Sequence, residues 1–150
     1  MVQTKNLGYG IETIHAQRDY LFIGTTNGVK ILDTSDPSNI EEISEFEHVT
    51  SCDPVVANTN FAISTIRGGT PCGGSINELN IINIDDITNP TLIMSEALTN
   101  PYGLGFSTED ENTIYVWDGH DGLKAFNISE IDNLEMTLHY TDVIARDVIP

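Results

Sequence analysis

Residues 28–40 read GVKILDTSDPSNI, an apolar strand that runs into an acidic turn containing proline. Two later segments have the same order of residue types: residues 78–90, ELNIINIDDITNP, and residues 122–134, GLKAFNISEIDNL. One apolar residue in each segment sets the register, at spacings of 50 and 44 residues: Val29, Leu79 and Leu123. Self-similarity at a spacing of this length predicts a repeat architecture in which each unit is one small supersecondary element.

The stretches that precede these segments align as well. They read DYLFIG at residues 19–24, NFAIS at residues 60–64 and TIYVW at residues 113–117. Short β-branched and aromatic runs between Asn, Asp, Gly and Pro are typical of strands and turns, and no long window has helical periodicity. Each unit is therefore predicted as four strands, the fourth represented by residues 41–47. Consecutive apolar positions, as in residues 20–23, predict strands that are covered on both faces.

Four strands in about 45 residues match one blade of a β-propeller. We therefore expect an all-β fold with three four-stranded blades, at about residues 10–50, 51–100 and 101–142, and the start of a fourth at residues 143–150. Propellers close with roughly 4–8 blades, so three blades leave a ring open. The chain is interpreted as a fragment of a larger propeller, and self-association that completes the ring is the alternative.

The predicted hairpin turns carry glycine, which adopts positive φ without steric cost. Positive φ is expected in the Asn-Gly pair of the first unit and at two glycines of the third: Gly28, Gly119 and Gly122. The second unit departs from this pattern, because residues 67–76 contain four glycines and Cys72. We expect a longer loop there in place of the hairpin.

The strand and turn at residues 29–37, VKILDTSDP, resemble the LVIVD repeat, whose units read as an apolar strand followed by Asp-Ile-Ser-Asp-Pro. The resemblance covers nearly the whole chain, although residues 85–87 and 129–131 depart from the Ser-Asp-Pro that the family prefers. Residues 51–55 and 100–105 further resemble the subset carried by Bacteroidetes surface proteins. The resemblance implies a bacterial or archaeal cell-surface propeller, and it implies no particular chemistry.

Charge is the most uneven feature of the composition, with six Lys and Arg against 23 Asp and Glu and a formal net charge of −17. Such a surface repels polyphosphates, so nucleic acid is not expected as a partner. The acidic residues are spread along the chain, which favours a solvated surface over an acidic docking face. No stretch approaches the roughly 18 apolar residues of a transmembrane helix, and no transmembrane segment is expected.

The first strand of each propeller blade lines the central channel. The starts of the predicted first strands carry four residues at matching positions: Glu12, Asp53, Tyr102 and Asp147. Converging carboxylates suit calcium, which takes about 6–8 oxygen ligands. The sequence favours the alternative that each carboxylate accepts backbone N–H groups at its strand end, because a partial ring leaves a ligand set incomplete. These four residues are the candidate ligand site; no cofactor is expected, and calcium is the alternative.

Residues 118–122 resemble a metal-binding loop by composition, with Asp118, His120 and Asp121 as weaker metal candidates. The loop lacks the downstream Glu of an EF-hand, which favours a solvated hairpin. The four histidines lack the H-x-x-x-H or HExxH spacing of metalloenzymes. Nucleophile-elbow and phosphate-loop signatures are also missing from the sequence, so no catalytic residue is predicted.

The two cysteines, Cys52 and Cys72, are too far apart to form the close Cys-x-x-Cys pair of a zinc site. In an exported protein a disulfide between them ties the glycine-rich loop to the start of the same unit's first strand. Two reduced thiols in a cytosolic protein are the alternative.

These features favour a non-enzymatic scaffold, a secreted or cell-surface propeller that presents loops to a protein or a glycan. The first residues lack the apolar core of a signal peptide, so an export signal is expected upstream. The enzyme alternative is a metal-dependent propeller hydrolase or lyase that uses the channel carboxylates Glu12, Asp53 and Asp147. A self-assembling structural module is a third hypothesis, since one fold hosts many functions.

Overall fold

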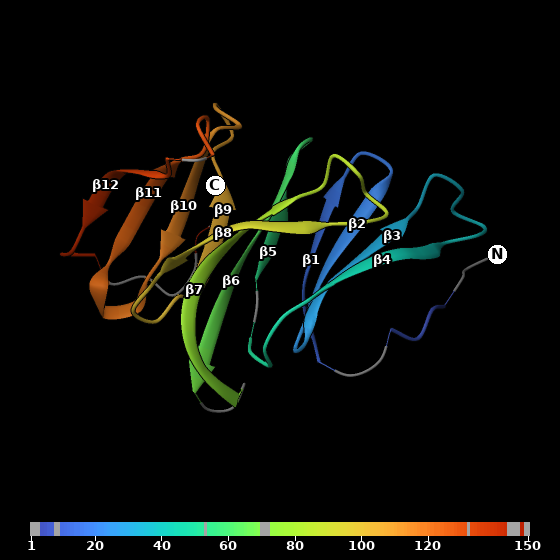
Figure 1. The fold of residues 1–150 in the computed structure, drawn as a ribbon, viewed down its shortest axis with the longest axis horizontal. Helices are drawn as coiled ribbons and strands as arrows, with labels where there is room; N and C mark the ends of the chain where they lie inside the picture. The colour runs from blue at the N-terminus through green and yellow to red at the C-terminus, as the bar shows by residue number, and fades with distance from the viewer. Residues whose placement is uncertain are drawn as a thin grey trace.

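Three antiparallel sheets of four strands each make up the described part of the chain (Figure 1). The computed structural model describes residues 4–7, 10–52, 54–69, 73–131, 133–143 and 148. The regular elements of these residues are strands and one 3-10 turn. The predicted all-β class with four-stranded blades is therefore confirmed. The predicted fourth unit, at residues 143–150, lies almost entirely outside the described residues.

Each sheet follows the chain as a simple meander, and we number the sheets as blades 1 to 3. Blade 1 contains β1 (Ile11–Gln17), β2 (Tyr20–Thr25), β3 (Gly28–Asp33) and β4 (Glu41–Glu47). Blade 2 contains β5 (Val55–Ala57), β6 (Phe61–Gly69), β7 (Gly73–Asn83) and β8 (Thr91–Ala97). Blade 3 contains β9 (Gly103–Phe106), β10 (Thr113–Trp117), the 3-10 turn η1 (Gly119–Asp121), β11 (Leu123–Asn127) and β12 (Glu135–Tyr140).

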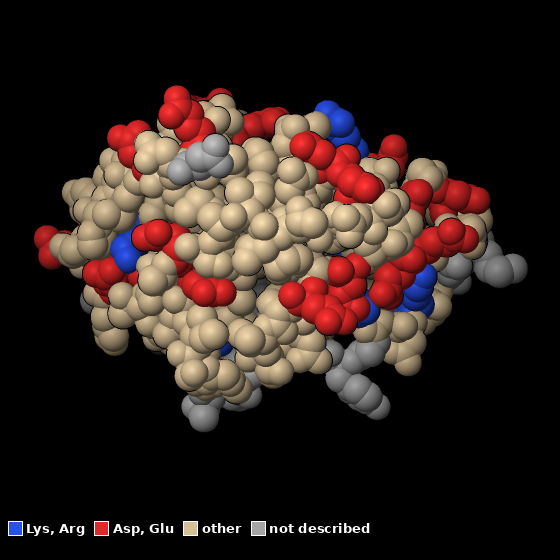
Figure 2. Space-filling view, viewed as in Figure 1, with Lys and Arg blue, Asp and Glu red and all other residues tan. Residues whose placement is uncertain are grey.

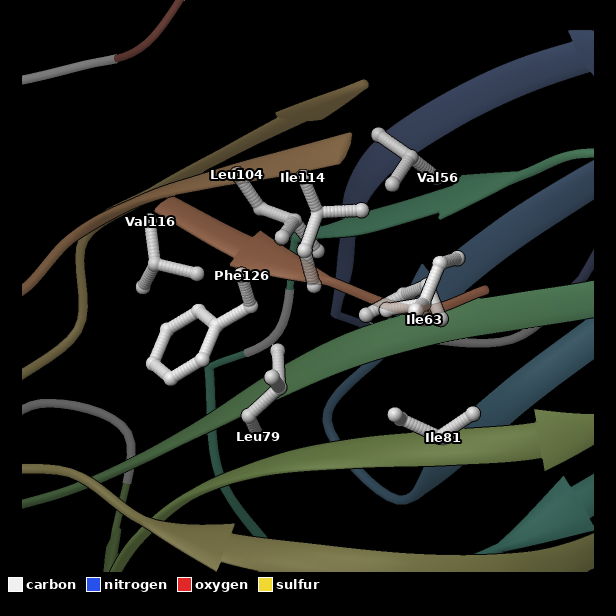
Figure 3. Close-up of a cluster of buried hydrophobic side chains, with 9 residues drawn as sticks. Val56, Ile63, Leu79, Ile81, Leu104, Ile114, Val116 and Phe126 are labelled. Atoms are coloured by element: carbon white, nitrogen blue, oxygen red, sulfur yellow. The ribbon is translucent and has the colours of Figure 1, made fainter. Parts of the chain in front are cut away.

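The blades stack face to face, and β5 lies against both β1 and β9. Blade 2 is consequently covered on both faces. Nine apolar side chains fill the joint between blades 2 and 3 (Figure 3), among them Ile63 and Leu79 of blade 2 and Ile114 and Phe126 of blade 3. A second cluster fills the joint between blades 1 and 2, with Ala62 of β6 facing this side. Neighbouring residues of one strand thus point into different joints, which explains the consecutive apolar positions in the sequence.

The acidic turns repeat in geometry as well as in sequence. After the third strand of each blade, the last strand residue accepts a hydrogen bond from the backbone N–H two positions on: Ser35 N–H to Asp33 (2.8 Å), Asp85 N–H to Asn83 (2.7 Å) and Ser129 N–H to Asn127 (2.8 Å). Short side chains that bond their own backbone in this way stabilise turns. The Asp and Asn residues that mark the repeat in the sequence therefore end the third strand of each blade.

The hairpin glycines differ in part from the expectation. Gly119 and Gly122 have positive φ, at 58° and 93°, as predicted. Gly28 does not, and the prediction of positive φ at this position is wrong. A side chain at Gly28 would strike the carbonyl oxygen of Phe46 on β4. Glycine is therefore needed at this position for the close approach of two strands and not for a left-handed turn.

The expected long loop at residues 67–76 is also different in the structure. The β6–β7 ladder continues through Arg67 and Asn77 and reaches a pair between Gly69 and Gly73. The segment is thus a hairpin longer than those of blades 1 and 3, projecting beyond them at one end of the sheets (Figure 1). The prediction failed because glycine is rare inside strands, so a glycine-rich stretch has the composition of a loop.

Candidate functional site

The starts of the first strands lie at the same end of the sheets as the hairpins between second and third strands, because Ile11 of β1 pairs with Thr25 of β2. We call this end the channel end. Two of the four predicted channel residues, Glu12 and Tyr102, are described there; Asp53 and Asp147 lie outside the described residues. Glu12 is exposed on β1. Tyr102 immediately precedes β9, and 45% of its surface is exposed.

Tyr102 is covered on one side by a cation that the sequence did not single out. The guanidinium carbon of Arg67 lies 4.2 Å from the centroid of the Tyr102 ring. Arg67 belongs to β6 of blade 2, so the contact crosses to blade 3. Such a pair contributes roughly 0.5–1 kcal/mol at an exposed site. The signal in the sequence was the length of the β6–β7 insertion, which carries Arg67 to the channel end.

A hydrogen bond fixes the other edge of this ring. The side-chain amide of Asn100 donates to the Tyr102 hydroxyl at 3.4 Å. This bond and the nearby Arg67 lower the pKa of Tyr102, because both favour the phenolate. Arg67, Asn100 and Tyr102 together form a partly exposed aromatic and cationic surface, which we call the channel-end platform.

A buried carboxylate holds the segment that carries this platform. The Asp118 side chain, fully buried, accepts backbone N–H bonds from Thr99 (2.9 Å) and Asn100 (2.6 Å). It also accepts a hydrogen bond from the Lys124 ammonium at 2.6 Å. Residues 99–102 therefore take their position from a charge-assisted network in blade 3. The predicted metal candidates Asp118 and Asp121 have a role in this network.

The cation between those two carboxylates is Lys124. Its ammonium lies 2.6 Å from both Asp118 and Asp121. Burial opposes the charge on Lys124, but hydrogen bonds and attraction from the two carboxylates leave its pKa raised. The same ammonium is the largest cause that lowers the pKa of Asp121. His120, the third candidate of this loop, is exposed on η1. Within the described ranges, no group of three or more His, Cys, Asp or Glu side chains is arranged to hold a metal ion.

The first cysteine lies beside the long hairpin. The backbone N–H of Cys52 donates to the carbonyl of Arg67 on β6 at 3.4 Å. A Cβ on Gly74 of β7 would lie 2.6 Å from the Thr50 carbonyl, so the hairpin packs closely on this segment. Cys72 lies outside the described residues, and its pairing with Cys52 stays a prediction.

Comparison with known proteins agrees with this architecture. The profile of the LVIVD repeat matches residues 12–47. That range spans β2, β3 and β4 and all of β1 except its first residue. Blade 1 thus matches the LVIVD repeat, as the sequence resemblance suggested. No protein of curated function matches the chain.

Two solved structures of β-propeller type share the fold. The structure of apo AztD from Citrobacter koseri is 13% identical with a TM-score of 0.59, and the alignment covers 93% of this chain and 38% of that one. The N-terminal domain of Nup159 is 12% identical with a TM-score of 0.52, with 88% and 31% covered. The chain therefore spans little more than a third of the AztD chain. In the described residues, no helix is long and apolar enough to cross a membrane.

Proposed function

We propose that this chain is part of a non-enzymatic β-propeller scaffold that binds a protein or a glycan at its channel end. The observation that carries the proposal is the channel-end platform, where the exposed Tyr102 ring is held by Arg67 and Asn100. An aromatic ring presents an apolar face with a polar tip, a combination enriched at binding surfaces. The buried network around Asp118 supports the platform with little freedom to reorganise, which lowers the entropic cost of binding.

The scaffold is proposed to be secreted or exposed on a cell surface. The LVIVD repeat in blade 1 supports this location through the family resemblance. Figure 2 shows Asp and Glu spread over one face with few Lys or Arg, as expected of a solvated surface. In that compartment we expect a disulfide between Cys52 and Cys72. The contact of Cys52 with β6 supports the pairing, since it places Cys52 beside the hairpin that contains Cys72 in sequence. Alkylation of the native chain followed by mass determination tests it, and two labelled thiols would refute it.

Binding is tested by applying the labelled chain to an array of glycans and of displayed peptides, followed by titration of the strongest ligand. We expect Tyr102→Ala to weaken that binding about tenfold, as loss of an aromatic anchor does. Met136→Ala is the control, because Met136 is similarly exposed, at 48%, but lies at the opposite end of the sheets, where β12 pairs with Phe126 of β11. Equal effects of the two substitutions would contradict a channel-end site. Cleavage of a bound glycan or peptide by the chain would instead support the hydrolase or lyase alternative.

A further inference from the structure

A cavity of about 200 Å³ lies between blades 1 and 2 at the end of the sheets opposite the channel end. Its walls come from three segments that are distant in sequence: the β1–β2 turn, the β5–β6 turn and the loop that follows β7 (Figure 1). The corresponding joint between blades 2 and 3 is built from equivalent turns. The two joints differ in one side chain of these turns, and this difference explains why the cavity forms between blades 1 and 2.

Equivalent residues of the turns are identified by one backbone bond that recurs in each blade. Its donors and acceptors are Thr34 N to Asp19 O, Ile84 N to Asn60 O, and Ile128 N to Asn112 O. Counting back from the acceptors, Gln17 corresponds to Asn58, and Thr59 corresponds to Glu111.

Asn58 closes the joint between blades 2 and 3. Its side-chain oxygen accepts the N–H groups of Asn60 (2.9 Å) and Phe61 (2.8 Å), which holds the turn. Its side-chain nitrogen donates to the carbonyl of Glu111 in blade 3 at 3.2 Å. One amide thus shapes its own turn and bridges to the next blade.

Among the described residues, Gln17 neither holds its own turn nor bridges to the next blade. It is one methylene longer than asparagine, and its side chain forms no hydrogen bond to blade 2 among the described residues. The next residue, Arg18, has a φ of 53° and is the single non-glycine residue with positive φ in the described ranges. Positive φ is the usual geometry at the first position of a two-residue hairpin turn, and this turn places Arg18 between the paired residues Gln17 and Tyr20. The bridge between the two turns is therefore missing at this joint, and the cavity occupies that region.

The cavity combines hydrogen-bonding groups with an apolar floor. Arg18 is exposed, and its guanidinium forms no hydrogen bond or ion pair within the described residues. The Asp85 carboxylate is oriented by the amides of Asn60 (3.3 Å) and Asn83 (3.4 Å). The floor consists of aromatic and aliphatic residues: Tyr20, Phe22, Ile84 and Ile87. An apolar surface with a few convergent donors and acceptors is the usual composition of a small-molecule site.

We propose that this cavity binds one neutral hydroxylated ring, such as a single sugar unit of a glycan. Its volume is below the roughly 300–1,000 Å³ that holds a drug-sized ligand, which limits the occupant to one ring. Hydroxyl groups both donate and accept, which matches Arg18 and Gln17 as donors and Asp85 as acceptor. Asp85 and the net charge of −17 disfavour an anionic ligand at the same position.

The inference rests on the proposed binding role only in naming a glycan, and it concerns a second site at the other end of the sheets. It is tested by titrating the isotope-labelled full chain with methyl glycosides of glucose, galactose, mannose and N-acetylglucosamine, and with glucuronate. We expect a neutral glycoside to shift the amide resonances of Gln17, Thr59 and Asp85. Arg18→Ala should weaken this binding about tenfold, because a charged hydrogen bond is lost.

Gln17→Asn is the decisive variant, because it introduces the residue that bridges the other joint. We expect it to fold normally and to lose glycoside binding. Glu109→Gln, an exposed change in blade 3, is the control and should leave binding unchanged. Tighter binding of glucuronate than of every neutral glycoside, unchanged binding by Gln17→Asn, or no shift with any glycoside would each overturn the proposal. Glycan binding that is lost in Tyr102→Ala but kept in Gln17→Asn would retain the channel-end function and reject this site.

Discussion

One position of the repeat has a different chemistry in each blade. It lies on the third strand and is occupied by Lys30, Asn80 and Lys124. Lys30 bonds Glu42 and Glu45 on its own sheet, and all three side chains are partly exposed. Asn80 is buried and accepts the Ser95 hydroxyl at 2.6 Å. Only the third copy places a lysine against a fully buried carboxylate, Asp118. The side chain at this position therefore contributes a very different free energy of folding in each of the three blades.

This difference predicts unequal effects of the same substitution. Lys124→Met leaves the Asp118 carboxylate buried without its cation, which costs about 3–5 kcal/mol of unfolding free energy. Lys30→Met removes a solvent-screened pair and costs about 1 kcal/mol or less. Urea unfolding of both variants measures the two values. Similar losses in the two variants would show that the Asp118 network is not the stronger pair.

His15 links blade 1 to blade 2 and predicts a pH dependence. Its Nε2 lies 2.8 Å from the Ala57 carbonyl, and burial lowers its pKa below the ordinary 6.5. As pH falls through 6.5, the unfolded chain takes up the proton before the folded chain does, so stability decreases. His15→Gln, which keeps a donor but does not titrate, should flatten the unfolding free energy between pH 5 and 7 measured in urea. An unchanged slope would assign the pH dependence to other groups.

At the scale of the elements, stability depends on which joint a strand face enters. Ile63 of β6 is fully buried between blades 2 and 3 (Figure 3), whereas Leu92 of β8, in the same sheet, is 48% exposed. Truncation of a buried Ile to Ala loses transfer free energy and leaves a cavity, at about 2–5 kcal/mol.

We therefore expect Ile63→Ala to destabilise the chain by about 2–5 kcal/mol and Leu92→Ala by about 0.5 kcal/mol or less. Chemical denaturation followed by tryptophan fluorescence measures both, since Trp117 is buried in blade 3. Loss of the Trp117 signal before the loss of β-sheet circular dichroism would show that the joint, and not the whole chain, is the unit that unfolds.

The elements were predictable because central strands such as β2 and β10 are apolar on both faces and each acidic turn must satisfy its own backbone. The channel-end platform was predictable only in part. Tyr102 stood at a repeated position, but the contact with Arg67 depends on how far β6 extends, and glycine composition hides that extension. The small cavity was not predicted. It lies where the Gln17 side chain forms no hydrogen bond to blade 2 among the described residues, and this depends on the register of the turns, which the sequence does not give.

For the whole molecule, the two joints use the sheet faces in the same order. The face of blade 1 that meets blade 2 carries Phe22 and Ile31, and the corresponding face of blade 2 carries Ile63 and Ile81 against blade 3. Contacts that repeat head to tail in this way are heterologous and propagate around an axis. The two joints therefore pack through equivalent faces. The charge of the exposed side chains acts on all three blades together.

The net charge of −17 predicts that salt stabilises this chain. Acidic side chains are scattered over the face in Figure 2, and their mutual repulsion is greatest in the compact state. Raising the ionic strength from about 0.01 M to about 0.15 M shortens the screening length from about 30 Å to about 8 Å, so the melting temperature should rise. A variant with Glu109→Gln, Glu111→Gln and Glu130→Gln, three exposed acids of blade 3, should begin at a higher melting temperature and gain less from salt. If sodium chloride lowers the melting temperature of the native chain, attractive pairs such as Lys124 with Asp118 outweigh the repulsion between exposed acids.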